Sequence, residues 1–344
     1  MYKVISLFSG AGGSTEGYKQ AGYNVIAAVE FVDYQANNYR LNHSGKIYED
    51  DIRKIDPINI LNDFNIKVGE LDILDGSPPC ASFSTAGKRS KLWGKEKIYS
   101  NKKQRTDDLF YEYIRFLEIM KPKIFVAENV SGLIKGVAKG KFNQILNEFR
   151  KLDYNVKCKV LNSKYYGVPQ SRERVIFIGV RKDLDIDPCF PDPDNNIITI
   201  KKAFENLPKE NKIQSDFLIN QARYYIKGWY GILLKIPKNP SKVLKGSKYA
   251  NGSYFNLSRL SYNAPSDTIC QMNGEKSASG NCHPIYDRKL TIYEVKRICG
   301  FPDDYKLEGS FKQQWEAMGR SVPPPLIKSI AKTIKEKILD KTKV

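Results

Sequence analysis

The sequence has little cysteine and no long hydrophobic run. Its six cysteines are scattered through 344 residues without a C-x-x-C pair, which argues against both a zinc site and a disulfide framework. No stretch approaches the roughly 18 uncharged apolar residues of a membrane-spanning helix, and the apolar stretch that ends at Phe8 is too short for a signal peptide. Internal repeats and low-complexity tracts are absent as well. These absences predict a reduced, cytoplasmic protein that binds neither a metal nor a membrane.

What is present fits an ordinary globular protein. A content of 41% hydrophobic and 27% charged residues rules out wholesale disorder. A length of 344 residues suggests about two domains, at roughly 100–200 residues per domain.

The charge is strongly positive and unevenly distributed. The 56 Lys and Arg residues outnumber the 38 Asp and Glu residues by 18, which favours a polyanionic partner such as nucleic acid. Residues 85–105 hold eight basic residues and one acidic residue, and residues 201–248 hold eleven basic and three acidic ones. Clustering of this kind favours a phosphate-contacting surface over the alternative, a lysine-rich surface that only keeps the protein soluble.

The first half of the chain alternates apolar stretches with helical ones. The apolar stretches, which predict short buried strands, are Lys3–Leu7, Val25–Val29, Leu71–Leu74, Ile124–Ala127, Val156–Leu161 and Val175–Val180. The stretches with helical spacing are Thr15–Gln20, Tyr34–Leu41, Leu109–Met120 and Phe142–Leu152. This alternation predicts an α/β fold with a doubly wound, mostly parallel sheet, and ligands at the carboxyl ends of its strands.

The pattern changes near residue 183. Residues 183–193 are rich in Asp and Pro, and the following segment is rich in Lys, Asn, Tyr and Gly without clear periodicity. We therefore expect a first domain over residues 1–183 and a second, smaller and more irregular one over residues 184–300. Residues 301–344 are predicted to form a hinge and a C-terminal helix that packs back on the first domain.

A glycine loop follows the first predicted strand. Phe8-Ser9-Gly10-Ala11-Gly12-Gly13-Ser14 opens a helix, where glycines permit close approach of a ligand and the helix amino terminus favours an anionic group. Glu30 ends the second strand, where a carboxylate can bind ribose hydroxyls. The spacing G-x-G-G weakens the case for a dinucleotide, and a nucleoside with a small carboxylate tail fits as well. The alternative is a tight turn without a ligand.

Three further segments carry reactive side chains. Cys80 follows Pro78 and Pro79, which fix the backbone at a strand end, so we favour a reactive thiol over a small buried hydrophobe. Glu128 and Asn129 end an apolar strand, where a partly desolvated carboxyl group can donate a proton, or where these residues only cap the next helix. Arg172 and Arg174, two apart, could point to one side and bind a carbonyl and a phosphate, or form a surface ion-pair cluster.

Together these segments resemble the motifs of the DNA (cytosine-5) methyltransferase family, of the bacterial restriction–modification type. In order, the matching segments are F-S-G-A-G-G, G-S-P-P-C, A-E-N-V, Q-S-R-E-R-V, R-K-L-T from Arg288 and M-G-R-S-V-P-P from Met318. The resemblance spans nearly the whole chain except residues 184–258, where this family places its variable target-recognition region. It implies a Rossmann-like S-adenosylmethionine-dependent methyltransferase fold, with catalytic and cofactor-binding residues in the first domain and target recognition in the second.

The resemblance also implies a mechanism. Cys80 would attack C6 of a cytosine flipped out of duplex DNA, and Glu128 would protonate its N3. Arg174 would hold the cytosine O2 with Arg172 nearby, and Asn129 would order the loop around Cys80. Residues 85–105 match the family's mobile loop, in which the expected DNA contacts are Lys88, Arg89, Lys91 and Arg105.

The expected cofactor is S-adenosylmethionine, and the partner is double-stranded DNA bound by a monomer. The cofactor residues implied by the resemblance are Phe8, Gly10, Ala11, Gly12, Gly13, Glu30, Phe31, Asp51, Ile52, Pro79 and Leu109. One departure is Arg320, which stands where the family usually has Asn and could pair with the methionine carboxylate or turn to solvent. Alternatives are a tRNA cytosine-5 methyltransferase, a catalytically inactive DNA-binding homologue and, from the glycine loop alone, a nicotinamide oxidoreductase.

Overall fold

The computed structural model describes residues 1–79, 97–99, 102–104, 108–134, 139–250, 257–271 and 280–343. The predicted nucleophile Cys80 lies outside the described residues, as do the predicted DNA contacts Lys88, Arg89, Lys91 and Arg105.

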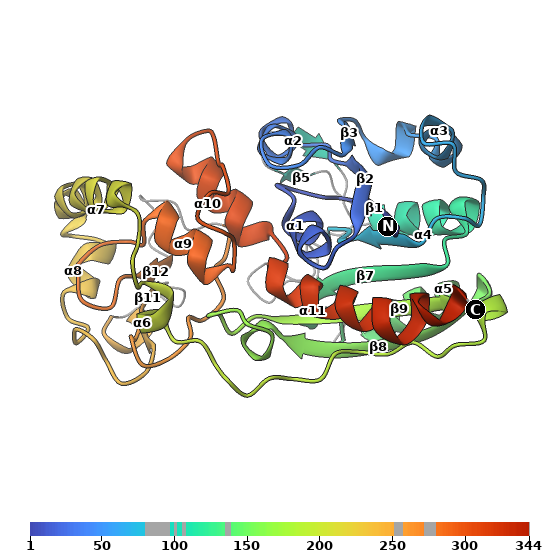
Figure 1. The fold of residues 1–344 in the computed structure, drawn as a ribbon. Helices are drawn as coiled ribbons and strands as arrows, with labels where there is room; N and C mark the ends of the chain where they lie inside the picture. The colour runs from blue at the N-terminus through green and yellow to red at the C-terminus, as the bar shows by residue number, and fades with distance from the viewer. Residues whose placement is uncertain are drawn as a thin grey trace. The chain divides into compact units, whose positions relative to one another are not determined.

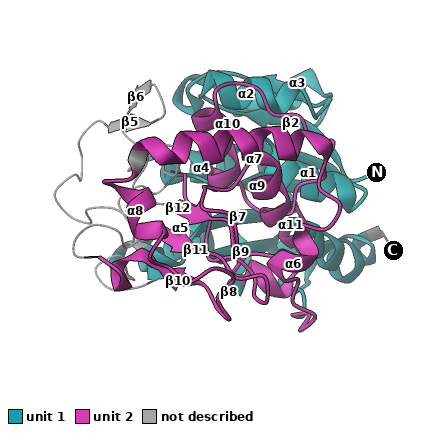
Figure 2. Cartoon of the chain, turned by 90° about the vertical axis from the view of Figure 1, so that its left-hand side faces the viewer, with its two compact units in different colours: residues 1–161, 173–192, 327–344 teal, residues 162–172, 193–326 magenta. Residues whose placement is uncertain are grey.

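The chain forms two compact units, which Figure 2 colours separately. Unit 1 comprises residues 1–161, 173–192 and 327–344, and unit 2 comprises residues 162–172 and 193–326. These boundaries differ from the three consecutive regions expected above, because residues 162–172 and 301–326 belong to unit 2 and residues 184–192 to unit 1. The assignment of cofactor binding to one unit and target recognition to the other stays a prediction.

Unit 1 is built on a seven-stranded sheet (Figure 1). Its strands lie in the order β3 (Lys46–Tyr48), β2 (Asn24–Val29), β1 (Lys3–Leu7), β4 (Ile73–Gly76), β7 (Ile124–Val130), β9 (Glu173–Arg181) and β8 (Tyr154–Asn162). The pairs from β3 to β7 are parallel, and β9 runs antiparallel to β7. The predicted α/β fold with a mostly parallel sheet is therefore confirmed. Two short strands, β5 (Lys97–Tyr99) and β6 (Lys102–Gln104), form a separate antiparallel pair.

Helices connect the parallel strands of unit 1. They are α1 (Gly13–Gln20), α2 (Asp33–Arg40), α3 (Pro57–Asp63), α4 (Leu109–Met120) and α5 (Lys139–Lys151). The α4 sequence places apolar residues three and four apart, and their side chains are buried in the main core. Tyr113 fixes α4 to the sheet, because its hydroxyl donates to the carbonyl oxygens of Leu74 (3.0 Å) and Val126 (3.1 Å).

The last helix begins in unit 2 and continues into unit 1. It is α11 (Pro324–Ile334), and a π-helical turn at Lys335–Leu339 follows it. Within unit 1, the Tyr23 hydroxyl donates to the carbonyl oxygen of Ala331 (2.9 Å) and the Tyr2 hydroxyl donates to Asp340 (2.7 Å). These hydrogen bonds attach the end of the chain to the strands and turns of its beginning.

Unit 2 contains short strands and more helix than its composition predicts. Its strands are β10 (Leu244–Lys245), β11 (Leu257–Arg259) and β12 (Gly280–Cys282), and its helices are α6 (Ile200–Ala203), α7 (Lys209–Ala222), α8 (Trp229–Leu233), α9 (Ile292–Ile298) and α10 (Phe311–Arg320). The lack of clear periodicity concealed α7, because its buried face consists of Ser215, Leu218 and Ala222 and so has only one large apolar side chain. The small core around Trp229 and Leu257 holds these elements together.

Short 3-10 turns connect several elements, at Ile52–Lys54, Ser131–Ile134, Ser163–Tyr165, Lys182–Leu184, Arg223–Tyr225, Gly246–Lys248 and Lys341–Lys343. Among the described residues, no helix has both the length and the apolarity that crossing a membrane requires.

Candidate active site

The candidate site lies where three neighbouring strands of unit 1 end. Strands β1, β4 and β7 are adjacent and parallel, so their carboxyl ends meet at one edge of the sheet. The glycine loop follows β1, the two prolines before Cys80 follow β4, and Glu128 and Asn129 lie at the end of β7. The topology thus brings together the three segments in which the sequence predicts reactive or ligand-binding residues.

The glycine loop is shaped by residues in the left-handed region. Gly10 (φ 56°) and Gly12 (φ 93°) adopt conformations that favour glycine, and Phe8 (φ 55°) adopts one although it carries a side chain. A Cβ built on Gly10 would meet no atom within 4 Å, so the backbone there borders open space. The imidazole of His43 forms a hydrogen bond with the backbone of Gly12. A loop held in this way, with open space beside it, suits close approach of a ligand.

Glu30 is fixed beside this loop by backbone donors. One carboxylate oxygen accepts from the amide of Gly10 (2.8 Å), and the other accepts from the amides of Phe31 (3.0 Å) and Val32 (2.8 Å). The acid predicted from sequence therefore lies next to the predicted loop in a fixed orientation.

Three apolar residues predicted to contact the cofactor share one cluster. Ile52 and Leu109 are buried in the main core of unit 1, and Phe8 packs against it. Asp51 lies beside Ile52 and forms an ion pair with Arg53 (3.0 Å), which also pairs with Asp108 (2.7 Å). Pro79 is half-buried at the end of the described segment that precedes Cys80.

Glu128 forms an ion pair with Arg174. The Nε of Arg174 lies 2.6 Å from Oε1 of Glu128, and the two side chains are only 12% and 11% exposed. The antiparallel register of β7 and β9 produces this contact, since Val130 lies opposite Arg174 and Glu128 opposite Ile176. A carboxyl group and a guanidinium that lie together and are largely shielded from solvent can bind two adjacent polar atoms of one planar ligand.

Asn129 links the end of β7 to the proline segment. Its side-chain amide donates to the carbonyl oxygen of Pro78 (3.1 Å), and its side-chain oxygen accepts from the amide of Val130 (2.9 Å). The backbone just before Cys80 is thereby tied to the strand that carries Glu128.

Arg172 has different partners from those of Arg174. Its guanidinium is buried in unit 2, where it donates to the carbonyl oxygens of Ile269 (2.9 Å) and Gly319 (2.9 Å). The partners of the two arginines differ, since Arg174 pairs with Glu128, and a shared role at the site stays a prediction. These contacts give Arg172 a structural place in unit 2.

Arg320, which departs from the family pattern, is engaged within unit 2. Its Nε donates to the side-chain oxygen of Gln271 (2.8 Å), and it forms an ion pair with Glu316 one turn earlier on α10. The first contact joins α10 to the segment that ends at Gln271, and the second lies within α10.

Asp75, near the end of β4, was missed by sequence reasoning. It is 3% exposed and accepts hydrogen bonds from hydroxyl groups of β1 and α1. The signal in the sequence was an acidic residue directly after the predicted strand Leu71–Leu74, three positions before Pro78.

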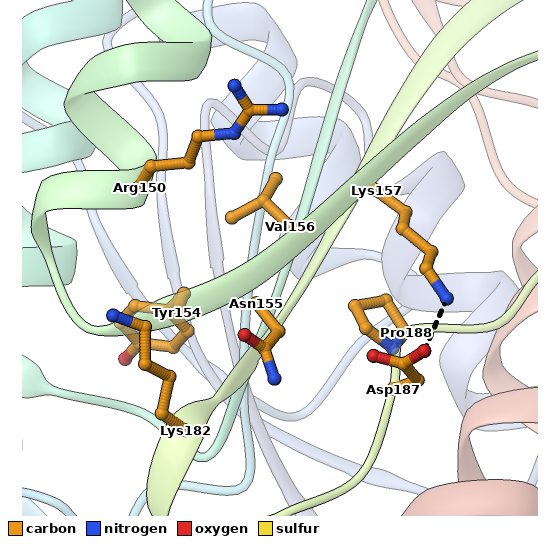
Figure 3. A pocket seen from close by; sticks show the side chains of 8 residues that line it. All are labelled: Arg150, Tyr154, Asn155, Val156, Lys157, Lys182, Asp187 and Pro188. Carbon is orange, nitrogen blue, oxygen red and sulfur yellow. Dashed lines mark hydrogen bonds and ion pairs between the residues drawn. The ribbon is translucent and has the colours of Figure 1, made fainter.

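A separate cavity of about 400 Å³ lies along β8 (Figure 3). It is lined by Arg150, Tyr154, Asn155, Val156, Lys157, Lys182, Asp187 and Pro188, and Lys157 and Asp187 form an ion pair there (2.8 Å). None of the predicted site residues that the structure describes lines this cavity. Among the described residues, no group of three or more His, Cys, Asp or Glu side chains is placed to hold a metal ion.

Comparison with known proteins decides the family. The family model for C-5 cytosine-specific DNA methylases matches residues 2–336. The chain belongs to this family. It is a DNA cytosine-5 methyltransferase, as the resemblance of its motifs implied.

Individual relatives agree with this assignment over nearly the full chain. The Type II methyltransferase M.FnuDI of Fusobacterium nucleatum is 33% identical over 99% of this chain and 96% of its own length. M.NgoFVII of Neisseria gonorrhoeae is 33% identical over 96% of this chain and 86% of its own length. Among solved structures, DNMT2 of Spodoptera frugiperda matches with a TM-score of 0.69 at 17% identity, over 98% of this chain and 100% of that one, which shows a shared fold.

Proposed function

We propose that this methyltransferase transfers a methyl group from S-adenosylmethionine to C5 of a cytosine flipped out of a specific duplex DNA sequence. We also propose that a covalent bond forms transiently between Cys80 and C6. The observation that carries this proposal is the ion pair of Glu128 with Arg174 (2.6 Å) at the end of β7. Asn129 joins that strand end to the prolines that precede Cys80 (3.1 Å).

Each protein group has one task in this mechanism. The Cys80 thiolate attacks C6 while the Glu128 carboxyl group donates a proton to N3, so that electron density moves to C5. Arg174 binds the O2 atom beside N3, which suits a guanidinium that already lies next to the carboxyl group. After C5 has gained the methyl group, the C5 proton passes to water, the electrons of that bond form the C5–C6 double bond as the sulfur–carbon bond breaks and releases Cys80, and N3 returns its proton to Glu128. The base must leave the helical stack, because inside a duplex N3 is paired with guanine and the neighbouring bases block attack on C6 from above or below the ring.

The glycine loop and its neighbours fit the proposed cofactor. Glu30 would accept the ribose hydroxyls, and the open backbone at Gly10 would allow the methionine part to approach. Phe8, Ile52 and Leu109 share the apolar cluster that would flank the adenine. Asp51 precedes Ile52 in the sequence, Phe31 follows Glu30, and Pro79 precedes Cys80. When bound, S-adenosylmethionine supplies an electrophilic methyl group on sulfur.

We further propose a role in restriction–modification, which rests on the relatives named as Type II methyltransferases. In this role the enzyme acts as a cytoplasmic monomer on double-stranded DNA. The basic segments 85–105 and 201–248 would supply phosphate contacts.

Bisulfite sequencing of DNA from cells that express the protein tests this function. We expect methylated cytosine within one short sequence for the wild-type protein and none for Cys80→Ser. Cys158→Ser is the matched control, because Cys158 is an exposed free thiol on β8. Sequencing the RNA of the same cells tests the tRNA alternative. Unchanged DNA methylation by Cys80→Ser would exclude Cys80 as the nucleophile.

A further inference from the structure

The cavity along β8 is lined by more positive than negative charge. Its cations are Arg150 at the end of α5, Lys157 on β8 and Lys182 in the turn after β9, and Asp187 is the acid among its lining residues. The three cations come from three separate segments of unit 1 (Figure 3). Arginine and lysine side chains placed around one hollow suit an anion that carries more than one negative charge.

The acids beside these cations are held only at the exposed rim. Lys157 pairs with Asp187 (2.8 Å), which is 75% exposed, and Lys182 pairs with Asp153 (3.4 Å), which is 87% exposed. Exposed ion pairs contribute little to stability, so either lysine can exchange its acid for a ligand. Among the described residues, no acid forms an ion pair with Arg150.

The floor of the cavity is part of the packed core. Tyr154 is 3% exposed, and its hydroxyl donates to the carbonyl oxygen of Pro122 (2.6 Å). Pro188 is buried, and Val156 packs against the main core of unit 1. Walls fixed in this way keep a cavity open and reduce the cost of ordering it around a ligand. A volume of about 400 Å³ lies in the range of small-molecule sites.

Further cations act on the segment that borders the cavity. Cys189 follows Pro188, which lines the cavity. Burial raises the pKa of the Cys189 thiol, and the charges of Lys337, Lys157 and Lys341 lower it. The positive charge of this region therefore extends beyond the lining residues to the end of the chain.

The cavity lies at the edge of the sheet opposite the candidate active site. In the register of β7 and β9, Arg174 lies opposite the last residue of β7 and Val180 opposite the first. Lys182 follows the end of β9, so it lies beyond the amino end of β7, whereas Glu128 lies near the carboxyl end. The cavity is therefore separate from the sites expected to bind cytosine and cofactor.

We propose that the cavity along β8 is a binding site for the phosphate groups of a small anion, held by the guanidinium of Arg150 and the ammonium groups of Lys157 and Lys182. This site does not depend on the proposed methyl transfer. Two kinds of ligand share this chemistry, an inorganic polyphosphate and a phosphate ester of a small organic molecule. For an ester, Val156 and Pro188 offer an apolar wall.

Calorimetric titration at low salt tests the site, with pyrophosphate, ribose 5-phosphate and uncharged ribose as probes. We expect wild type to bind at least one phosphate compound and not ribose, and the tighter of the two phosphates identifies the kind of ligand. Arg150→Gln and Lys182→Gln should each weaken that binding by about fivefold, because each removes one attracting charge. Asp187→Asn should strengthen it by about threefold, because it frees Lys157 and removes a repelling charge.

Lys151→Gln is the matched control. Lys151 follows Arg150 on α5 and pairs with Glu148 (2.9 Å), but it does not line the cavity. Its substitution removes the same charge from the same end of the helix, and we expect affinity within about twofold of wild type. Circular dichroism checks that each variant is folded.

Three results would overturn the proposal. The first is that wild type binds neither phosphate compound. The second is that Lys151→Gln weakens binding as much as Arg150→Gln does, which would indicate attraction by the overall positive charge. The third is that Asp187→Asn binds no more tightly than wild type. Failure of the wild-type protein to methylate DNA would overturn the proposed function and leave this site untouched, since the two are measured separately.

Discussion

The contact between Glu128 and Arg174 is the residue-scale feature on which the chemistry depends. A carboxyl group beside a guanidinium is well placed to bind two neighbouring atoms of a pyrimidine, but only the carboxyl group can deliver a proton. Glutamine at position 128 would keep the size and one donor and lose the transferable proton. Proton donation and the binding of O2 can therefore be separated by substitution.

We expect Glu128→Gln to slow methyl transfer by about 10²–10⁴-fold, because positioned proton donors contribute about that much to rates. The measurement is transfer of tritiated methyl groups to duplex DNA under single-turnover conditions. Glu148→Gln is the control, since Glu148 lies on α5 and pairs with Lys151 (2.9 Å). A near-normal rate for Glu128→Gln would place the proton donor elsewhere.

At the residue scale, the sequence predicted most residues of the candidate site from their positions at the ends of strands. Glu30, Glu128 and Asn129 end apolar strands, and the topology of a parallel sheet brings strand ends together. The hydrogen bonds of Asp75 and Arg172 were missed, because both depend on partners distant in sequence. Asp75 binds hydroxyl groups 57 and 69 positions away, and Arg172 binds the carbonyl oxygen of Gly319, 147 positions away.

At the scale of elements, long apolar patterns were predictable and short exposed elements were not. The predicted strand Lys3–Leu7 and helix Leu109–Met120 have the observed bounds, because the strand is buried after its first residue and the helix has a regular buried apolar face. Strand β3 was missed, since it has three residues, pairs with β2 at one edge and is at most half-buried. The sequence pattern also did not predict that β9 runs antiparallel to β7, because the alternation of strands and helices does not indicate the direction of a strand.

In the whole molecule, the two histidines lie in different units, where His283 is buried and His43 is half-buried, and both resist protonation. Burial lowers the pKa of His43 in unit 1 and of His283 in unit 2 to about 4. Nδ1 of His283 accepts from the backbone amides of Ile285 (3.1 Å) and Tyr286 (3.0 Å), and a proton on this nitrogen would break both bonds. The unfolded chain, with an ordinary imidazole pKa near 6.5, therefore binds protons more readily between pH 6.5 and 4.

This difference predicts acid destabilisation through His283. The contribution of the neutral imidazole is fully present above pH 6.5 and is lost as the pH falls toward 4, by up to about 3 kcal/mol. We expect the midpoint temperature of thermal unfolding to fall less between pH 7 and pH 4.5 in His283→Gln than in wild type. Comparison with the variant is necessary because Asp75 acts in the opposite direction, since its raised pKa stabilises the folded state as the pH falls below 7. Parallel pH curves for the two proteins would contradict this account.

The covalent step is the central claim for the whole enzyme, and trapping it on DNA is the most direct test. In a duplex with 5-fluorocytosine at the target position, the fluorine cannot leave C5 as a proton does, so the sulfur–carbon bond persists after methyl transfer. We predict that mass spectrometry of the digested complex finds the modified nucleotide on the peptide that contains Cys80. An enzyme that methylates ordinary DNA but forms no such adduct, or forms it on another cysteine, would contradict the mechanism.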